Sequence, residues 1–187
     1  EGADLSSLPA EEYDFVLSSH MLEHTANPLR ALGGWKRLLK PGGTLILVVP
    51  HRDGTFDHRR PVTTLEHLTA DFDLAMGEDD VTHASEVLAL HDVSRDPGVV
   101  DMAAFRDRVA RNPEMRSMHH HVFDTRLAAR CVAKAGFDLL SVEPLEPYHV
   151  VVLAQKRSAG ADTASLSDED LSRVLRASPF ETDRHSA

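Results

Sequence analysis

Residues 13–50, which read YDFVLSSHMLEHTANPLRALGGWKRLLKPGGTLILVVP, decide the fold of this chain. The apolar run at 13–19 predicts a short buried strand, and the run at 44–49 predicts a second one. Between them Asn27 is a suitable helix N-cap, and Pro28 stands at the first helical position, where its missing N–H costs nothing. The stretch therefore predicts one βαβ unit, whose two apolar strands suit a parallel sheet covered on both faces.

The helix of this unit has one apolar face and a definite end. Leu29, Leu32 and Trp35 recur at helical spacing. The Pro-Gly-Gly run at 41–43 predicts a turn that stops the helix before the second strand.

A long segment without strand patterning follows the second strand. Residues 51–119 carry turn signals and several short helical patterns, of which 78–91 and 101–111 are the longest, but no period-two alternation. They predict a mostly helical insertion. Insertions of this size between strands of a sheet commonly form substrate lids.

Regular structure returns after the insertion. Asp124 is a suitable N-cap for a helix that Gly136 ends in the left-handed conformation. Strands follow at 137–142 and 148–154, close enough to pair as an antiparallel hairpin. Residues 157–187 are polar and predict a disordered tail with one short helix around 168–176.

Composition excludes several classes of protein. A net charge of −10 argues against a nucleic-acid binder, because polyanion affinity needs clustered lysine and arginine. No run approaches the roughly 18 apolar residues of a membrane span. The single cysteine, Cys131, excludes an internal disulfide and suits a reducing, cytoplasmic compartment. Because it lies in an apolar helical pattern, we expect a buried and inert thiol.

Thirteen residues of the opening stretch resemble the class I S-adenosylmethionine-dependent methyltransferases, and most closely their small-molecule group. The matching residues are Asp14, Val16, Leu22, Glu23, His24, Pro28, Leu32, Arg37, Leu39, Lys40, Pro41, Gly42 and Gly43. The resemblance covers residues 1–50 and 120–156. It implies a Rossmann-like α/β fold, of which this chain is the C-terminal part: a mostly parallel sheet with an antiparallel final hairpin. The expected domain is 1–156, with 51–119 as the substrate lid and 157–187 as the tail.

The resemblance implies that S-adenosylmethionine is the cofactor and that a small-molecule or sugar-bearing acceptor is methylated. The sequence contains no G-x-G-x-x-G loop, which cradles the cofactor in this family. We therefore expect a chain truncated at its N-terminus, inactive by itself, whose first strand is a bare apolar edge. The alternative is a catalytically inactive interaction module. In either case a partner or a second copy is expected to cover that edge.

The remaining cofactor contacts can be carried over from the resemblance. Asp4 and Leu5 match the segment that meets the adenine, through a carboxylate and a backbone N–H. Ser18 and Ser19 match the strand end that lies against the methionine part, and His20 follows them and faces the substrate. In an open α/β sheet the ligand crevice lies at the carboxyl ends of the strands.

Three histidines are the candidate catalytic residues. His20 and His51 follow the carboxyl ends of adjacent predicted strands and are expected to converge on one crevice, while His121 represents the triplet at 119–121. Histidine titrates in the range that suits a general base for a hydroxyl acceptor. Glu23 and His24 are expected to fasten the loop to the helix rather than to react.

A metal site is another possible explanation for the twelve histidines of the sequence. His51, Asp53, Asp57 and His58 cluster within eight positions, but their spacing matches no standard zinc pattern. The sequence therefore predicts no metal site.

Overall fold

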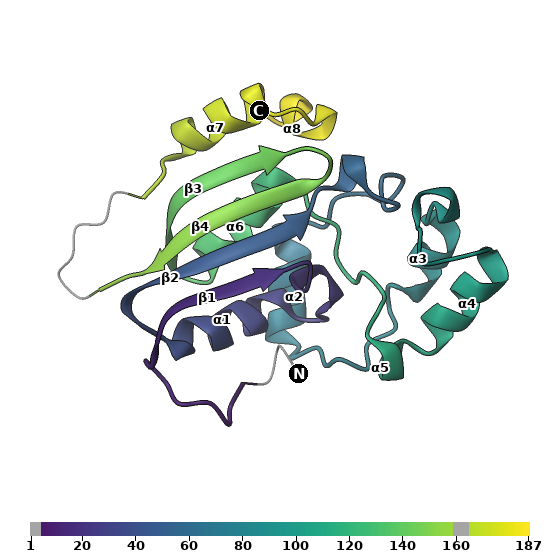
Figure 1. Ribbon diagram of the computed structural model, residues 1–187, viewed down its shortest axis with the longest axis horizontal. Helices are drawn as coiled ribbons and strands as arrows, with labels where there is room; N and C mark the ends of the chain where they lie inside the picture. The colour runs from purple at the N-terminus through teal and green to yellow at the C-terminus, as the bar shows by residue number, and fades with distance from the viewer. Residues whose placement is uncertain (1–4, 159–164) are drawn as a thin grey trace.

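The computed structural model describes residues 5–158 and 165–187. Its centre is a four-stranded sheet in the order β1–β2–β4–β3 (Figure 1). The strands are β1 (Tyr13–Ser19), β2 (Leu39–Pro50), β3 (Phe137–Leu145) and β4 (His149–Lys156). All four strands expected from the sequence are present, and β2 and β3 are longer than predicted.

The pairing of the strands differs from the expectation. β1 runs parallel to β2, with Leu17 opposite Ile46. β4 lies between β2 and β3 and runs antiparallel to both. The prediction of a mostly parallel sheet is therefore wrong for the described strands, because two of their three pairings are antiparallel. The predicted hairpin of β3 and β4 is confirmed.

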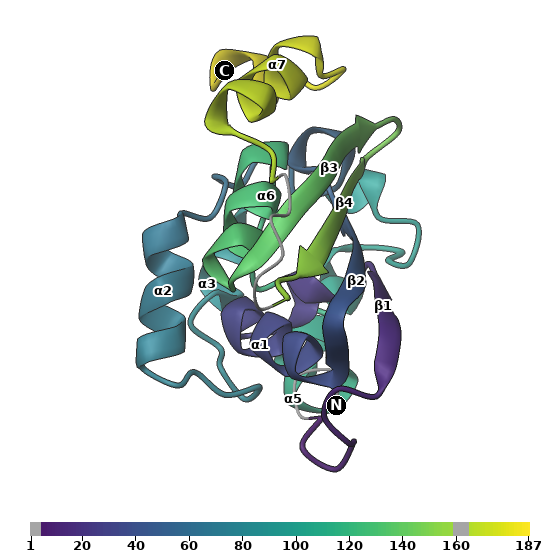
Figure 2. The ribbon, with the colours of Figure 1, turned by 90° about the vertical axis from the view of Figure 1, so that its left-hand side faces the viewer.

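Helices cover one face of this sheet (Figure 2). α1 (Pro28–Leu38) packs on β2 and α6 (Thr125–Lys134) packs on β3 and β4, while α2 (Leu65–Asp73) lies outside against both helices. The core between helices and sheet is aliphatic, and fully buried members include Leu32, Leu45, Leu47, Ala128, Val132, Val150 and Val152.

The predicted helix caps are formed. The Asn27 side chain accepts a hydrogen bond from the main-chain N–H of Arg30 at 3.0 Å. The Asp124 carboxylate accepts one from the N–H of Leu127 at 2.6 Å. Gly136 follows α6 with a φ of +83°, the left-handed conformation that glycine adopts without strain.

The Pro-Gly-Gly run has a different role from the predicted turn. α1 ends at Leu38, and residues 41–43 lie within β2, where the register against β1 shifts. A Cβ atom on Gly43 would lie 2.9 Å from the carbonyl oxygen of Lys40 and 3.2 Å from that of Asp14. The bulge therefore requires a residue without a side chain at position 43.

The opposite face of the sheet is open at β1. The side chains of Phe15 and Leu17 are each 61% exposed, and Tyr13 is 39% exposed. They share that face with Ile46 of β2, opposite Leu17. The first strand is therefore not buried on both faces, as its apolar run suggested. Among the described strands it lies at the edge of the sheet and exposes apolar side chains.

The insertion at 51–119 is mostly helical, as predicted. It contains α2, α3 (Ala84–Leu90), α4 (Met102–Ala110) and α5 (Asn112–Met115), with single 3-10 turns at Arg52–Gly54 and Val93–Arg95. The residues that pack its separate small core are Val87, Phe105, Val109 and Met118. Figure 1 shows α3 to α5 beyond the carboxyl ends of β1 and β2.

The C-terminal segment differs from the expected tail. Residues 168–177 form α7 (Asp168–Ala177), close to the predicted short helix, and α8 (Glu181–His185) follows. The buried side chains of Leu171 and Leu175 extend the main core beside β3. Two leucines one helical turn apart explain this packing, which the polar composition of the segment concealed. The prediction for 159–164 lies outside the described residues.

Every helix in the described part of the chain is too short or too polar to cross a membrane.

Candidate functional site

The predicted cofactor residues of β1 lie at its carboxyl end. Ser19 is exposed and Ser18 is buried, and the Ser18 hydroxyl has no hydrogen-bond partner among the described residues. His20 follows with a φ of +50°, an uncommon conformation for a residue with a Cβ atom. Such outliers often occur at functional sites, so the strand end remains a candidate ligand contact.

The N-terminal part of the predicted cofactor site is only partly described. Leu5 is half-buried and packs against the main core. Its carbonyl oxygen accepts a hydrogen bond from Arg37 at 2.6 Å. The prediction for Asp4 lies outside the described residues.

His51 points into different surroundings from His20. Its side chain is fully buried, stacks on the Phe180 ring with centroids 3.9 Å apart, and meets the Asp183 carboxylate at 3.1 Å. His20 instead contacts His149, with Nε2 3.0 Å from Nδ1 of that ring. The two predicted bases therefore do not converge on one crevice, because the C-terminal helix α8 encloses His51.

His121 is also enclosed. Its side chain is fully buried, with Nε2 3.4 Å from the carbonyl oxygen of Ala26 and 3.6 Å from the Asp71 carboxylate. The first residue of the triplet, His119, instead lies beside Glu23 and His24.

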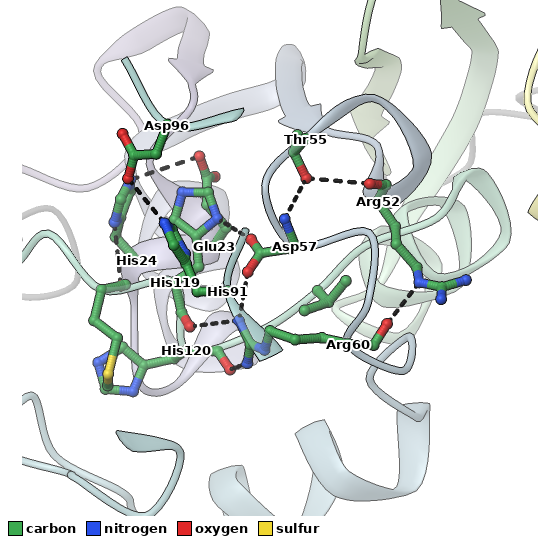
Figure 3. A network of polar contacts seen from close by, with 12 residues as sticks. Glu23, His24, Arg52, Thr55, Asp57, Arg60, His91, Asp96, His119 and His120 are labelled. Carbon is green, nitrogen blue, oxygen red and sulfur yellow. Dashed lines mark hydrogen bonds and ion pairs between the residues drawn. The ribbon is translucent and has the colours of Figure 1, made fainter. Parts of the chain in front are cut away.

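A buried carboxylate occupies the centre of the region beyond β1 (Figure 3). Glu23 is 1% exposed, and neither of its carboxylate oxygens has a hydrogen-bond partner among the described residues. His20 Nδ1 and His24 Nε2 each lie 3.8 Å from Oε1. The ligand atoms of Glu23, His24 and His119 all lie within 4.8 Å of one another. Three imidazoles therefore surround one buried acid, and we call these four residues the Glu23 cluster.

Burial sets the protonation of this cluster. Burial raises the pKa of Glu23 to about 7, although the nearby His119 lowers it. Burial and the neighbouring His119 lower the pKa of His24 to about 4, and burial with His149 lowers the pKa of His20. Near neutral pH the carboxyl of Glu23 can therefore gain or lose a proton, while His20 and His24 remain neutral acceptors.

The orientation of His24 is fixed by a main-chain group. Its Nδ1 lies 3.2 Å from the carbonyl oxygen of Met118. Because a carbonyl only accepts, Nδ1 carries the proton and donates it. In the neutral ring Nε2 is then unprotonated and faces Glu23, so a protonated Glu23 has an acceptor close by.

His119 is held by residues of the insertion. Its Nδ1 lies 2.5 Å from Asp57 Oδ2, and Arg60 Nη1 donates to Asp57 Oδ1 at 3.1 Å. Burial would raise the pKa of Asp57, but the hydrogen bonds and charges of His119 and Arg60 outweigh it and lower the pKa. Asp57 is therefore a carboxylate that orients the His119 ring, as Figure 3 shows.

Local backbone structure brings these residues together. Residues 22–24 form the 3-10 turn η1 (Leu22–His24), which turns Glu23 inward. Its carbonyl oxygen accepts the N–H groups of His120 at 2.8 Å and His121 at 3.3 Å. The segment that returns from the insertion is thereby fixed against the end of β1.

The sequence interpretation missed most of this cluster. The sequence predicts that Glu23 and His24 fasten the loop to the helix, and it does not indicate that His119 meets Asp57, 62 positions away. The four residues that lie close together in sequence at 51–58 have separate partners: His51 pairs with Asp183, Asp53 with Thr182, Asp57 with His119, and His58 with Asp92. The pairing of a buried carboxylate with neutral imidazoles suits proton transfer, and Glu23, His24 and His119 could also ligate a cation.

Comparison with known proteins identifies the domain family of the chain. A family model described as a methyltransferase domain matches residues 3–142. A highly reducing polyketide synthase, pkhB of Emericella nidulans, is 58% identical over 38 residues, which are 20% of this chain and 2% of that protein.

Solved methyltransferases are similar in structure at low sequence identity. A S-adenosylmethionine-dependent methyltransferase from Methanosarcina mazei is 17% identical, with a TM-score of 0.47 over 84% of this chain and 65% of that one. One from Aquifex aeolicus is 14% identical, with a TM-score of 0.43 over 83% of this chain and 51% of that one. The chain thus spans about half the length of the Aquifex enzyme. Because the family match covers most of its residues, the chain belongs to the class I S-adenosylmethionine-dependent methyltransferase domain family.

Proposed function

We propose that this domain methylates a small-molecule or sugar-bearing acceptor and that the Glu23 cluster takes up the proton that the acceptor releases. The observation that carries the proposal is the Glu23 carboxylate, which is buried without a hydrogen bond and faces three imidazoles at the carboxyl end of β1. An uncompensated buried carboxylate is costly to a fold, so its presence beside a strand end favours a chemical role.

The residues at the end of β1 fit the methionine part of the cofactor. The orphaned hydroxyl of Ser18 is available for a polar ligand atom, and Ser19 is exposed beside it. Ser18 and Ser19 would hold the amino-acid end of the cofactor, while Leu5 would contact the adenine. When bound, the cofactor supplies an electrophilic methyl group on sulfonium, and positioning of the acceptor provides most of the rate.

Within the Glu23 cluster the exposed residues would touch the acceptor. The side chains of His20 and His24 are 33% and 26% exposed, whereas Glu23 is enclosed behind them. A neutral histidine accepts the proton of the acceptor, and Glu23 stabilises the resulting charge. His20 is therefore the proposed base, whereas His24, whose unprotonated Nε2 faces Glu23, is a positioning residue, and Glu23 is the carboxyl group that both histidines meet.

The insertion contributes to the same site. Asp57 and Arg60 come from it and fix His119 against Glu23. This contact supports the role of residues 51–119 as the lid that selects the acceptor. The likeness to a polyketide synthase makes acceptors of the polyketide type the first group to test.

The open face of β1 favours a second candidate function. Phe15 and Leu17 form an exposed apolar pair on an edge strand, and such edges normally have a partner. A methyltransferase-like interaction module, in which a partner covers this face, would use the same surface.

The experiment combines cofactor binding with methyl transfer. Calorimetry with S-adenosylhomocysteine measures cofactor binding, and transfer of labelled methyl is followed over a panel of phenols, amines, sugars and short polyketide acids.

Glu23→Gln and His24→Ala should lower turnover by roughly 100-fold or more with unchanged cofactor affinity. Glu114→Gln, at an exposed glutamate of α5, is the matched control. Wild-type turnover in both cluster variants would exclude the proposed proton transfer. Absence of both cofactor binding and transfer, together with self-association that Phe15→Ser abolishes, would favour the interaction module.

A further inference from the structure

A second group of ligand-type side chains lies outside the Glu23 cluster, between the insertion and the body of the fold. His67 and Asp71 are four residues apart and face the same side of α2. His83 precedes α3, and His121 lies on the segment that returns to the sheet. Three segments that are distant in sequence therefore bring three imidazoles and one carboxylate together.

The separation of these groups matches a tetrahedral metal site. One ligand atom from each residue lies within 4.8 Å of the other three. His67 Nε2 is 3.2 Å from His83 Nε2 and 3.4 Å from Asp71 Oδ2, and His121 Nε2 is 3.6 Å from that same oxygen. Zinc–nitrogen bonds of about 2.0–2.1 Å put tetrahedral ligands about 3.3–3.4 Å apart. The four atoms would draw closer around a common ion, and His121 Nε2, which lies 3.4 Å from the Ala26 carbonyl oxygen, would release its proton on binding.

Two polar atoms of this group have no hydrogen bond within the described part of the chain. Asp71 Oδ2 and His121 Nδ1 are buried there without a hydrogen-bond partner. A bound cation would supply the partner that the Asp71 carboxylate oxygen lacks, and imidazoles bind such an ion in their unprotonated form.

Surrounding hydrogen bonds fix two of the ligands in advance. Asn27 Nδ2 donates to the main-chain oxygen of Asp71 at 2.9 Å. Asp80 accepts the N–H and the hydroxyl of Thr82 at 3.0 and 2.8 Å, which sets the turn that presents His83. Supporting contacts of this kind are typical of metal sites.

One side of the site is open to solvent. His67 and His83 also line a surface cleft that includes Glu86, and the His67 side chain is 43% exposed. An ion can therefore enter without unfolding of the core.

We propose that His67, Asp71, His83 and His121 form a binding site for one divalent transition-metal ion, with Zn²⁺ as the best match. Three imidazole nitrogens exclude Ca²⁺ and Mg²⁺, which take oxygen ligands. Four protein ligands complete a tetrahedral shell, as in structural zinc sites. The ion acts as a clamp that ties α2 and the start of α3 to the segment carrying the histidine triplet.

The experiment measures metal binding directly and needs no enzymatic activity. The full chain is stripped with a chelator and dialysed, then titrated with Zn²⁺ against a chromophoric competitor, and its metal content is determined by mass spectrometry. We expect one Zn²⁺ per chain and a rise in melting temperature on binding. Co²⁺ should give the intense visible absorption of a four-coordinate ion.

Alanine substitutions test which histidines bind the metal ion. His67→Ala and His83→Ala should each weaken Zn²⁺ binding by about 100-fold or more and abolish the four-coordinate Co²⁺ spectrum. Both positions reach the surface, so far-UV circular dichroism should show a folded protein. His185→Ala, at an exposed histidine of α8, is the matched control and should bind as the wild type does.

Three results would overturn the assignment. The first is a wild-type chain that retains no stoichiometric metal. The second is unchanged affinity in both His67→Ala and His83→Ala. The third is loss of the metal in Glu23→Gln with full binding in His67→Ala, which would move the ion to the Glu23 cluster.

Discussion

Asp183→Ala tests whether the C-terminal helices are an integral part of the fold. The Asp183 carboxylate is fully buried and joins α8 to the sheet and to α6. It meets His51 Nε2 at 3.1 Å, the Thr125 N–H at 3.1 Å, and the hydroxyls of Thr125 and Ser178 at 2.6 Å each. The substitution leaves these four donors buried without their acceptor.

The expected loss is large for a single substitution. Removing one partner from a buried charged network costs about 3–5 kcal/mol. For a chain of this length each kcal/mol shifts the melting temperature by about 2–4 °C, so the decrease should be roughly 6–20 °C.

The loss should also depend on pH. Burial would raise the pKa of Asp183, but hydrogen bonds from His51, Ser178 and Thr125 outweigh it and lower the pKa. A lowered pKa means that the ionised carboxylate stabilises the folded chain above the ordinary aspartate pKa of about 4, and that this contribution disappears as the pH falls through the folded-state pKa. The difference between wild type and variant should therefore be largest at neutral pH and shrink below about pH 4.

The assay is thermal unfolding followed by circular dichroism at pH 7 and at several pH values below 5. Asp168→Asn, at an exposed aspartate in the first turn of α7, is the control and should change stability by less than about 0.5 kcal/mol. If Asp183→Ala melts with the control at pH 7, the C-terminal helices contribute no cooperative stability and the reasoning is refuted.

Three further changes test local structure. Asp124→Ala removes the N-cap bond to the Leu127 N–H and should lower unfolding free energy by about 1–2 kcal/mol in urea titrations; an unchanged midpoint would contradict the cap. Gly43→Ala places a Cβ atom 2.9 Å from the Lys40 carbonyl oxygen and should destabilise the chain by more than about 1 kcal/mol, a loss that wild-type stability would disprove. Burial raises the pKa of Cys131 to about 12, so iodoacetamide at pH 8 should label it only after unfolding, as mass spectrometry can show.

Much of the fold could be predicted because local signals coincided with tertiary structure. The Asn27 and Asp124 caps, the left-handed Gly136 and the β3–β4 hairpin each depend on neighbours close in sequence. The direction of the pairing at β2 could not be predicted in this way, since it depends on β4, which begins about 100 residues later. The packing of α7 was missed because its two buried leucines lie in a polar segment.

The candidate site was less predictable than the fold. The sequence indicated the end of β1, since Ser18, Ser19 and His20 follow an apolar strand. It could not indicate that a 3-10 turn directs Glu23 inward or that Asp57 reaches His119 from the insertion. It also predicted a common crevice for His51, whose side chain is instead enclosed by Phe180 of the C-terminal segment. The position of each of these side chains depends on contacts between segments that are distant in sequence.

The histidine triplet connects the two clusters. His119 faces Asp57 and His121 faces Asp71, so two residues of one short segment belong to the two different clusters. The N–H groups of residues 120 and 121 both donate to the carbonyl oxygen of Glu23, which fixes this segment to the end of β1. A metal ion on His121 would therefore restrain the backbone that orients His119 toward Glu23. One short segment would thus connect the proposed metal site to the geometry of the proposed proton-transfer site.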